Sequence, residues 1–245
     1  MKREVSIITV CYNSGNTIAR TFDSLLSQTV KNFEYIVVDG KSNDNTVDII
    51  KRYEPMFIEA GIDFKWSSEP DKGIYDAMNK GLSKATGRLI GILNSDDVYF
   101  PKTVQIVTNE WKEDASYQVY HGMMRYESNG ELVSITGHCS NVLYKGGMIE
   151  HPTCFVPRNT YEKYGTFDLK YRYAADLDLM MRIKMGGGRF RLIPEVLAVY
   201  SEDGAGNCNT SRDEAIDIKK KYGIINVSFA VMQKVKNHLY HMIRR

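Results

Sequence analysis

Short apolar segments alternate with amphipathic ones in the N-terminal half of the chain. Segments 5–10 and 33–38 are rich in β-branched residues and are followed by polar residues, which is typical of buried strands. Between them, segment 18–26 carries apolar residues at positions i, i+4, i+7 and i+8, the stripe of an amphipathic helix. Strands that alternate with helices at this spacing predict a parallel sheet with right-handed crossovers. We therefore expect an α/β fold with a Rossmann-like, mostly parallel central sheet flanked by helices.

The same pattern continues along the chain and becomes less regular after about residue 115. Asn16 and the segment 43–45 are expected to cap the first two helices. Further strands are predicted at 62–66, 89–93, 118–126, 131–135, 190–193 and 196–200, and further helices at 47–53, 73–85 and 101–111, from about 159, and at 176–185.

Three regions follow from this pattern. Residues 1–100 are expected to form a nucleotide-binding half, and residues 101–205 a mixed half of the same domain. Residues 206–245 are expected to form a basic helical extension, because no acidic residue follows Asp217. The extension carries one apolar stripe, made of Phe229, Met232, Val235, Leu239, Met242 and Ile243. Such a helix can lie on an anionic membrane surface, and a helix docked on the catalytic domain or a dimer contact would show the same stripe.

Composition narrows the class of protein. The chain has 245 residues, of which 43% are hydrophobic and 25% charged, and a net charge of +2, which is too small to indicate nucleic acid as the principal ligand. The four cysteines are scattered and form no Cys-x-x-Cys pair, which argues against a zinc site or a disulfide framework. No signal peptide and no apolar window of about 18 residues is present, so we expect a cytoplasmic protein without a membrane span.

Two acidic clusters carry most of the chemical information. Asn94-Ser95-Asp96-Asp97 follows the apolar segment 89–93, and Asp176-Leu177-Asp178 begins another apolar run. Carboxylates at the end of a buried strand are costly unless a cation or a proton offsets them. The first cluster therefore predicts a Mg²⁺ or Mn²⁺ site, with an Asx turn as the alternative. The second predicts a general base, with a helix cap or first-turn acid as the alternative for Asp176 and a structural i, i+4 pair for Asp178 and Arg182.

Ligands of open parallel sheets bind beyond the carboxyl ends of the strands. Polar residues stand at three such ends: Thr9, Tyr12 and Asn13 after the first strand, Asp39 after the second, and the 94–97 cluster. Asp39 is placed to accept a hydrogen bond from a nucleoside, and a turn role before Gly40 is the alternative.

Two common phosphate-binding motifs are missing. The sequence contains no Gly-x-x-x-x-Gly-Lys-Ser/Thr loop, and no Gly-x-Gly-x-x-Gly follows the first strand, so a dinucleotide redox cofactor is not expected. The glycine-rich segment 204–207 indicates only a mobile loop.

Five separated motifs occur in order along the chain. They are Ser6-Ile7-Ile8-Thr9-Val10-Cys11-Tyr12-Asn13, Val37-Val38-Asp39-Gly40, the segment from Ser68 to Gly81 (SEPDKGIYDAMNKG), Leu93-Asn94-Ser95-Asp96-Asp97, and Ala175-Asp176-Leu177-Asp178-Leu179. With these motifs the chain resembles, over about residues 4–200, a family 2 glycosyltransferase of the GT-A fold, of the type that acts in bacterial polysaccharide biosynthesis.

The resemblance implies a role for each matching residue. Asp96 would be the metal ligand of the family's DxD-type motif, although Asn94 stands at the position where many relatives have Asp. Asp176 would be the catalytic base, and Ala175 replaces the acid that precedes it in relatives. His151 lies where relatives have a loop facing the acceptor or a phosphate, and a structural role is equally open. The nucleotide-sugar-binding set would be Thr9, Tyr12, Asn13, Asp39, Glu69, Asp71, Asn94, Ser95 and Asp97.

The function implied is that of an inverting enzyme that transfers one sugar from a UDP-sugar to a saccharide acceptor with the help of Mn²⁺ or Mg²⁺. The acceptor is expected to be lipid-linked, as in polysaccharide, O-antigen or capsule biosynthesis, with peripheral contact to the inner face of the cell membrane through residues 226–245. A homodimer is left open. The alternatives are a sugar nucleotidyltransferase, which would need a basic glycine-rich loop after the first strand, and a non-catalytic module that binds nucleotide sugars.

Overall fold

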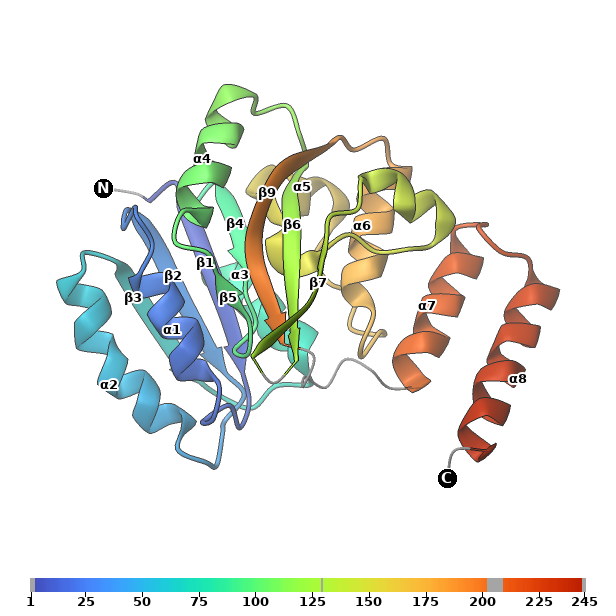
Figure 1. Cartoon of the computed structure of the whole chain (residues 1–245), viewed down its shortest axis with the longest axis horizontal. Helices are drawn as coiled ribbons and strands as arrows, with labels where there is room; N and C mark the ends of the chain where they lie inside the picture. The colour runs from blue at the N-terminus through green and yellow to red at the C-terminus, as the bar shows by residue number, and fades with distance from the viewer. Residues whose placement is uncertain (1–2, 129, 202–208, 244–245) are drawn as a thin grey trace.

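A single mixed sheet runs through the protein. The computed structural model describes residues 3–128, 130–201 and 209–243, so the glycine-rich segment 204–207 and Cys208 lie outside the described residues. The strands follow the order β3-β2-β1-β4-β8-β6-β9-β5, and β7 pairs with β6 (Figure 1). Their bounds are β1 Val5–Cys11, β2 Phe33–Asp39, β3 Asp63–Ser68, β4 Leu89–Ile92, β5 Val98–Tyr99, β6 Val119–Ser128, β7 Glu131–Thr136, β8 Phe155–Pro157 and β9 Phe190–Ser201.

Helices cover both faces of this sheet (Figure 1). They are α1 Ile18–Leu26, α2 Thr46–Glu59, α3 Ile74–Lys84, α4 Thr103–Glu113, α5 Arg158–Tyr164, α6 Ala175–Met185, α7 Asn209–Lys221 and α8 Val227–Ile243, with the short 3₁₀ helices η1 Ser140–Lys145 and η2 His151–Thr153.

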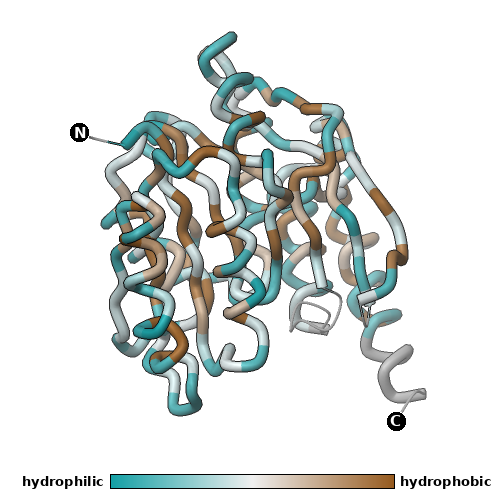
Figure 2. The backbone as a smooth tube through the Cα atoms, turned by 60° about the vertical axis from the view of Figure 1, so that its left-hand side comes forward, coloured by the Kyte–Doolittle hydropathy of each residue, from teal (hydrophilic) through white to brown (hydrophobic). Residues whose placement is uncertain are grey.

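The N-terminal half of the sheet is parallel, as the sequence predicts. Strand β1 pairs in parallel with β2 on one side and with β4 on the other, so the strand order reverses at β1. All residues of β1 and β2 are buried because each face packs against helices. Ile8 and Val10 belong to a core shared with α3 and α6, whereas Ile7 belongs to a second core on the face of α1, α2 and α4. Hydrophobic residues accordingly recur along the central strands in Figure 2.

The C-terminal half is mixed. Strand β8 runs antiparallel to β4 and thereby joins the two halves, while β6 and β9 run parallel to each other. The prediction of two strands at 190–193 and 196–200 is wrong, because β9 is one strand across Pro194. Proline has no N–H for the ladder, and the pairing of β6 with β9 shifts register at this point. The short strands β5 and β8 escaped prediction because two or three residues show no period.

One predicted helix cap is wrong and another is placed correctly. Helix α1 begins after Thr17, and no side chain caps it; instead the N–H groups of Thr17 and Ile18 donate to the Ser14 carbonyl at 3.0 Å each. Asn45 is at the N-cap of α2, as expected, but the nearby Asp44 carboxylate accepts the Thr46 N–H at 3.0 Å.

The C-terminal helices α7 and α8 lie side by side at one end of the molecule (Figure 1). Helix α7 also contacts α6, which connects the pair to the sheet. Within the described residues, no helix is both long enough and apolar enough to span a bilayer.

Candidate active site

The polar loops after β1, β2 and β4 meet at the carboxyl edge of the parallel strands, as the sequence predicts. The N–H of Asn13 donates to Ser42 Oγ at 2.8 Å, and the Asn13 side-chain oxygen accepts the Asn43 N–H at 3.0 Å. Asn13 adopts the left-handed conformation, with φ of 51°, to make these contacts. Ser14 Oγ and Ser95 Oγ share a hydrogen bond of 2.8 Å, which joins the loop after β1 to the acidic loop after β4.

Asp39 organises the loop that follows β2. Its carboxylate is fully buried and accepts hydrogen bonds from the Ser42 N–H at 3.0 Å, the Ser68 hydroxyl at 2.6 Å and the Ser42 hydroxyl. Burial and the adjacent charge of Asp39 raise the pKa of the Cys11 thiol, so that Cys11 stays neutral. These contacts show that Asp39 stabilises the turn at Gly40, which was the alternative role expected from the sequence. A contact of Asp39 with a nucleoside stays a prediction.

Tyr12 and Asp71 flank Gly40, whereas Thr9 lies beneath the surface. A Cβ atom at Gly40 would come within 2.4 Å of Asp71 Oδ2 and 3.4 Å of Tyr12 Cδ2. The Tyr12 side chain is 60% exposed. Thr9 is fully buried, and its hydroxyl oxygen accepts a hydrogen bond of 3.0 Å from Tyr35. Among these predicted nucleotide-binding residues, Tyr12 and Asp71 share one open surface, and Thr9 supports the strand below them.

Glu69 and Asp71 lie between β3 and α3. The Glu69 N–H donates to the Asp39 carbonyl at 3.0 Å, and its exposed carboxylate lies 3.6 Å from Lys84 Nζ. Asp71 Oδ1 accepts the Gly73 N–H at 2.8 Å at the start of α3. Both acids therefore stand at the same sheet edge as Asp39, and their predicted contacts with the nucleotide or donor sugar stay predictions.

The acidic loop after β4 holds carboxylate oxygens that have no partner. Asp97 is fully buried, and neither of its carboxylate oxygens has a hydrogen bond of normal geometry from the described residues; the same holds for Asn94 Oδ1. Burial, reinforced by the charge of Asp96, raises the pKa of Asp97 well above its usual range, with Arg20 among the groups that oppose this. Burial also raises the pKa of Asp96. Unpartnered buried oxygens of this kind fit a divalent cation.

The backbone of this loop is fixed by residues far away in the sequence. Thr21 donates to the Asp97 carbonyl at 2.8 Å, and Ser201 donates to the Asp96 carbonyl at 3.1 Å. Arg20 in turn donates to Ser201 Oγ at 3.1 Å. Sequence reasoning missed Arg20 and Ser201 because no local motif marks a residue on the outer side of α1 or at the end of β9.

No group of three or more His, Cys, Asp or Glu side chains that could hold a metal occurs among residues 3–128, 130–201 and 209–243. A metal at the acidic loop would therefore rely on few protein oxygens and would complete its shell with phosphate and water, which is usual for Mg²⁺.

Asp176 lies in the first turn of α6, two residues after the N-cap Ala174. Its Oδ1 accepts two hydrogen bonds, from the Tyr75 hydroxyl at 2.8 Å and from the Leu177 N–H at 2.9 Å. The buried Tyr75 ring stacks on Phe167, with ring centroids 5.4 Å apart. Tyr75 is thus a core aromatic, and its hydroxyl is the group that reaches the predicted base.

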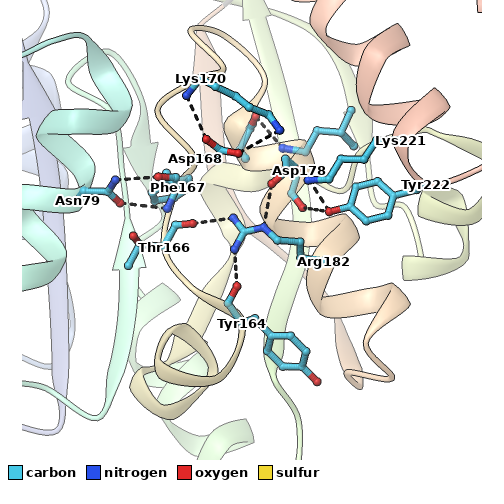
Figure 3. A network of polar contacts seen from close by, with 12 residues as sticks. Asn79, Tyr164, Thr166, Phe167, Asp168, Lys170, Asp178, Arg182, Lys221 and Tyr222 are labelled. Carbon is cyan, nitrogen blue, oxygen red and sulfur yellow. Dashed lines mark hydrogen bonds and ion pairs between the residues drawn. The ribbon is translucent and has the colours of Figure 1, made fainter.

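Asp178, two residues further on, is structural. Its buried carboxylate accepts hydrogen bonds from Arg182 Nε at 2.8 Å, Lys221 Nζ at 2.6 Å and the Tyr222 hydroxyl at 3.2 Å (Figure 3). The predicted pair with Arg182 is confirmed, and the contacts from Lys221 and Tyr222 connect α7 to α6. Asp178 is thus paired with two cationic side chains, whereas no Lys or Arg among the described residues forms an ion pair with Asp176.

His151 lies close to Asp176. Its ring meets Phe167 edge-on, with centroids 6.0 Å apart. Burial lowers the pKa of His151, and the negative charge of Asp176 opposes that shift. His151 is therefore a neutral neighbour of the predicted base.

A cavity of about 360 Å³ lies beside the Tyr75–Asp176 pair. The start of α3 forms one wall and the loop before α6 the other, and Lys72 and Arg172 bring two cations to it. Its lining is Lys72, Gly73, Ile74, Tyr75, Asp76, Leu169, Tyr171 and Arg172.

Residues 6–167 match the family model of glycosyl transferase family 2, which is more than half of the chain. The chain belongs to glycosyltransferase family 2. The matched residues include the loops after β1, β2 and β4 but end before α6 and Asp176. The family membership predicted from the motifs is confirmed, and the protein is a glycosyltransferase.

Curated relatives agree with this. The chain is 30% identical over 211 residues to a PGL/p-HBAD biosynthesis glycosyltransferase of Mycobacterium bovis. The alignment covers 85% of this chain and 80% of that protein. It is 27% identical over 241 residues to chondroitin synthase of Pasteurella multocida, of which it covers 24%.

Solved structures share the fold. Residues 1–349 of S. aureus TarS in complex with UDP-GlcNAc match with a TM-score of 0.71 and 18% identity, over 98% of this chain and 73% of that one. The mannosyltransferase PcManGT of Pyrobaculum calidifontis, in complex with GDP-Man and Mn²⁺, matches with a TM-score of 0.67 and 19% identity, over 91% of this chain and 63% of that one. The match to the longer TarS chain covers only 43% of it. These similarities confirm the predicted GT-A fold.

Proposed function

We propose that this glycosyltransferase transfers one sugar from a UDP-sugar to a hydroxyl of a saccharide acceptor, with inversion at the anomeric carbon. The observation that carries the proposal is the contrast between two acidic groups. Asp176 is bound by Tyr75, which lines a cavity, and one of its carboxylate oxygens receives no hydrogen bond from the described residues. Asp97 and Asn94, in contrast, have buried oxygens suited to a cation.

Asp176 acts as the general base. An acceptor hydroxyl has a pKa far above 7, so a carboxylate within hydrogen-bond reach has to take its proton as it attacks. The acceptor oxygen forms a bond to the anomeric carbon, the bond from that carbon to the diphosphate oxygen breaks, and the nucleoside diphosphate leaves with the electron pair. Asp176 keeps the proton until it exchanges with solvent. Attack opposite the leaving group inverts the anomeric centre and needs no covalent enzyme intermediate.

Asp96 holds the metal, with Asn94, Ser95 and Asp97 around the donor. The unpartnered oxygens at Asn94 and Asp97 and the raised pKa values of both aspartates support a cation at this loop. When bound, a divalent ion offsets the negative charge that develops on the leaving diphosphate. PcManGT, which was solved with Mn²⁺, supports the choice of Mn²⁺ or Mg²⁺.

The nucleoside binds across the loops after β1 and β2. Tyr12 presents an exposed ring beside Gly40 and Asp71, a surface on which a base can stack. Asn13, Asp39, Glu69 and Thr9 complete the set, with Thr9 supporting it from below. The TarS complexes with UDP and UDP-GlcNAc support a UDP-sugar as donor. Residues 1–100 would thus form the donor half, and residues 101–205 the acceptor half.

The acceptor is proposed to be lipid-linked, as in polysaccharide biosynthesis, with the enzyme held at the inner face of the cell membrane by α8. Helix α8 turns its small or polar residues Ala230 and Lys234 toward α7, where Lys234 Nζ lies 2.7 Å from Asp217 Oδ2. Val231, Met232 and Val235 are each more than half exposed on its other side. An outward apolar face on a segment without acidic residues suits an anionic lipid surface.

The enzymatic proposal is tested with a panel of nucleotide sugars and Mn²⁺ or Mg²⁺, scored by release of nucleoside diphosphate with and without saccharide acceptors. Asp96→Ala should weaken metal-dependent UDP binding, whereas Asp176→Ala should retain UDP binding and lose transfer. Near-wild-type transfer by Asp176→Ala would refute the base assignment. Release of pyrophosphate from a nucleoside triphosphate and a sugar phosphate would identify a nucleotidyltransferase, and a complete lack of turnover a binding module.

The membrane proposal is tested by flotation of the full chain with vesicles that contain anionic or only zwitterionic lipid. Val231→Ser/Val235→Ser should lose binding to anionic vesicles, whereas Thr210→Ser, on the exposed side of α7, is the control. Binding that is equal for wild type and the double variant would refute it. A change from dimer to monomer in the double variant, without any vesicle binding by the wild type, would assign this face to a homodimer contact.

A further inference from the structure

We propose that Tyr75 is a positioning residue for catalysis: its hydroxyl holds Oδ1 of Asp176, so that Oδ2 is the oxygen that takes the acceptor proton. The inference rests on the proposed role of Asp176 as the base. It assigns a function to the hydroxyl of a tyrosine whose ring is buried in the core.

The two oxygens of the Asp176 carboxylate have different surroundings. Oδ1 accepts the Tyr75 hydroxyl at 2.8 Å and the Leu177 N–H at 2.9 Å. No described residue donates to Oδ2. Two donors on one oxygen, one from α3 and one from α6, fix the rotation of the carboxylate about its Cβ–Cγ bond, which is otherwise a soft torsion. The second oxygen is then held in one orientation, and Tyr75, which donates to the other oxygen, lines the cavity.

Tyr75 can serve this purpose because it is itself held firmly. Its side chain is 6% exposed, and its ring stacks on Phe167 at 5.4 Å with an interplanar angle of 28°. One helical turn later, Asn79 donates to the Phe167 carbonyl at 2.9 Å and accepts the Phe167 N–H at 3.0 Å (Figure 3). One face of α3 therefore clamps the loop that leads into α6, and the distance from Tyr75 to Asp176 is set by this clamp.

The surroundings of the pair keep Tyr75 a neutral donor. Burial and the charge of Asp176 raise the pKa of Tyr75 far above its usual value, so the phenol keeps its proton. Burial lowers the pKa of His151 and raises that of the Cys154 thiol, so both are neutral near pH 7. Glu214, on α7, adds a weaker negative charge and is occupied by the N–H groups of residues 172–174.

The test compares Tyr75→Phe with wild type in kcat, KM and their pH dependence. Loss of a hydrogen bond to a charged group predicts a fall in kcat of about ten- to a hundredfold with KM for the donor within about twofold. Because the hydroxyl favours the ionised carboxylate, the acid limb of the kcat profile should move up by about half to one pH unit. Tyr53→Phe is the matched control, since it removes a Tyr–Asp hydrogen bond of 2.9 Å to Asp23, between α1 and α2.

A second substitution changes the strength of the bond without removing the ring contacts. Incorporation of 3-fluorotyrosine at position 75 makes the phenol a stronger donor, so the acid limb should move to lower pH, opposite to the shift in Tyr75→Phe. This variant also decides the question if Tyr75→Phe fails to fold.

The results separate this inference from the proposed function. If Asp176→Asn transfers sugar at nearly the wild-type rate, Asp176 is not the base and both ideas are wrong. If Asp176→Asn is inactive while Tyr75→Phe behaves like Tyr53→Phe in kcat and in pH profile, the base assignment stands and the positioning role is refuted. A change in KM alone, without any movement of the acid limb, would also refute it.

Discussion

The substitution Asp97→Asn should stabilise the metal-free protein. Asp97 is fully buried, and neither carboxylate oxygen has a hydrogen-bond partner of normal geometry among the described residues. Asn keeps the shape of the side chain and removes the charge next to Asp96. The substitution therefore removes a buried charge without opening a cavity.

The size of the effect follows from the cost of an unsatisfied buried group, which is about 1–3 kcal/mol and larger for a charged one. For a domain of this size, 1 kcal/mol moves Tm by about 2–4 °C. Asp97→Asn should therefore raise Tm in EDTA at pH 8 by roughly 2–12 °C. Asp97→Ala is less informative, because it also opens a cavity.

The pH dependence has a definite sign. The pKa of Asp97 is raised in the folded state, whereas it is about 3.9 in the unfolded chain. The folded state thus binds this proton more tightly, and the destabilisation by Asp97 is complete only above the raised pKa. As the pH falls through that value, the gap in Tm between wild type and Asp97→Asn should narrow, and below about pH 3.9 the contribution is gone.

Thermal unfolding in EDTA at a series of pH values from 8 down to about 3.9 measures this gap. A variant that is less stable than wild type at pH 8, or a gap that does not change with pH, would contradict the reasoning. In a parallel series with Mn²⁺ and UDP, the wild type should gain more stability than Asp97→Asn, because ligand that binds only the folded state stabilises it.

Three further outcomes are expected. Asp178→Asn should destabilise the protein by about 2–3 kcal/mol in urea unfolding, because the buried carboxylate binds the Arg182 side chain. The affinity for UDP should stay unchanged, and a loss of UDP binding without a loss of stability would speak against a structural role. Gly91→Ala should lower the free energy of unfolding by about 1–3 kcal/mol through overpacking, since a Cβ atom would lie 2.7 Å from the Phe155 ring. An unchanged unfolding midpoint would show that β4 and β8 can move apart to accommodate the methyl group. Tyr12→Ala should weaken UDP binding by about 1–3 kcal/mol in calorimetry, with little effect on Tm. If the variant and the wild type bind UDP with equal affinity, Tyr12 does not contact the nucleoside.

Local patterns determine the elements and the family of this protein. The period of apolar residues predicts β1, α1 and β2 within a few residues. The two strands are buried on both faces and α1 on one, so each has a regular pattern of apolar positions. The resemblance carried by the five motifs also identifies the glycosyltransferase family, which the family model confirms over residues 6–167. The i, i+4 spacing is enough to predict the pair of Asp178 and Arg182.

The roles within those motifs depend on contacts that local patterns do not encode. Asp39 and Asp97 both follow buried strands in the sequence, yet the first receives three hydrogen bonds from serines and the second receives none of normal geometry among the described residues. That difference arises because the serines come from the segment after β2 and from the end of β3, which the parallel sheet brings beside Asp39.

The setting of Asp176 was likewise decided by tertiary structure. Its partner Tyr75 is 101 residues away, on α3, and no local pattern links the two residues. Sequence determines which residues can be buried, because burial follows hydrophobicity and periodicity. Which polar atom meets which carboxylate is determined only when strands and helices distant in sequence are packed together, because a hydrogen bond requires a placement within a few tenths of an ångström.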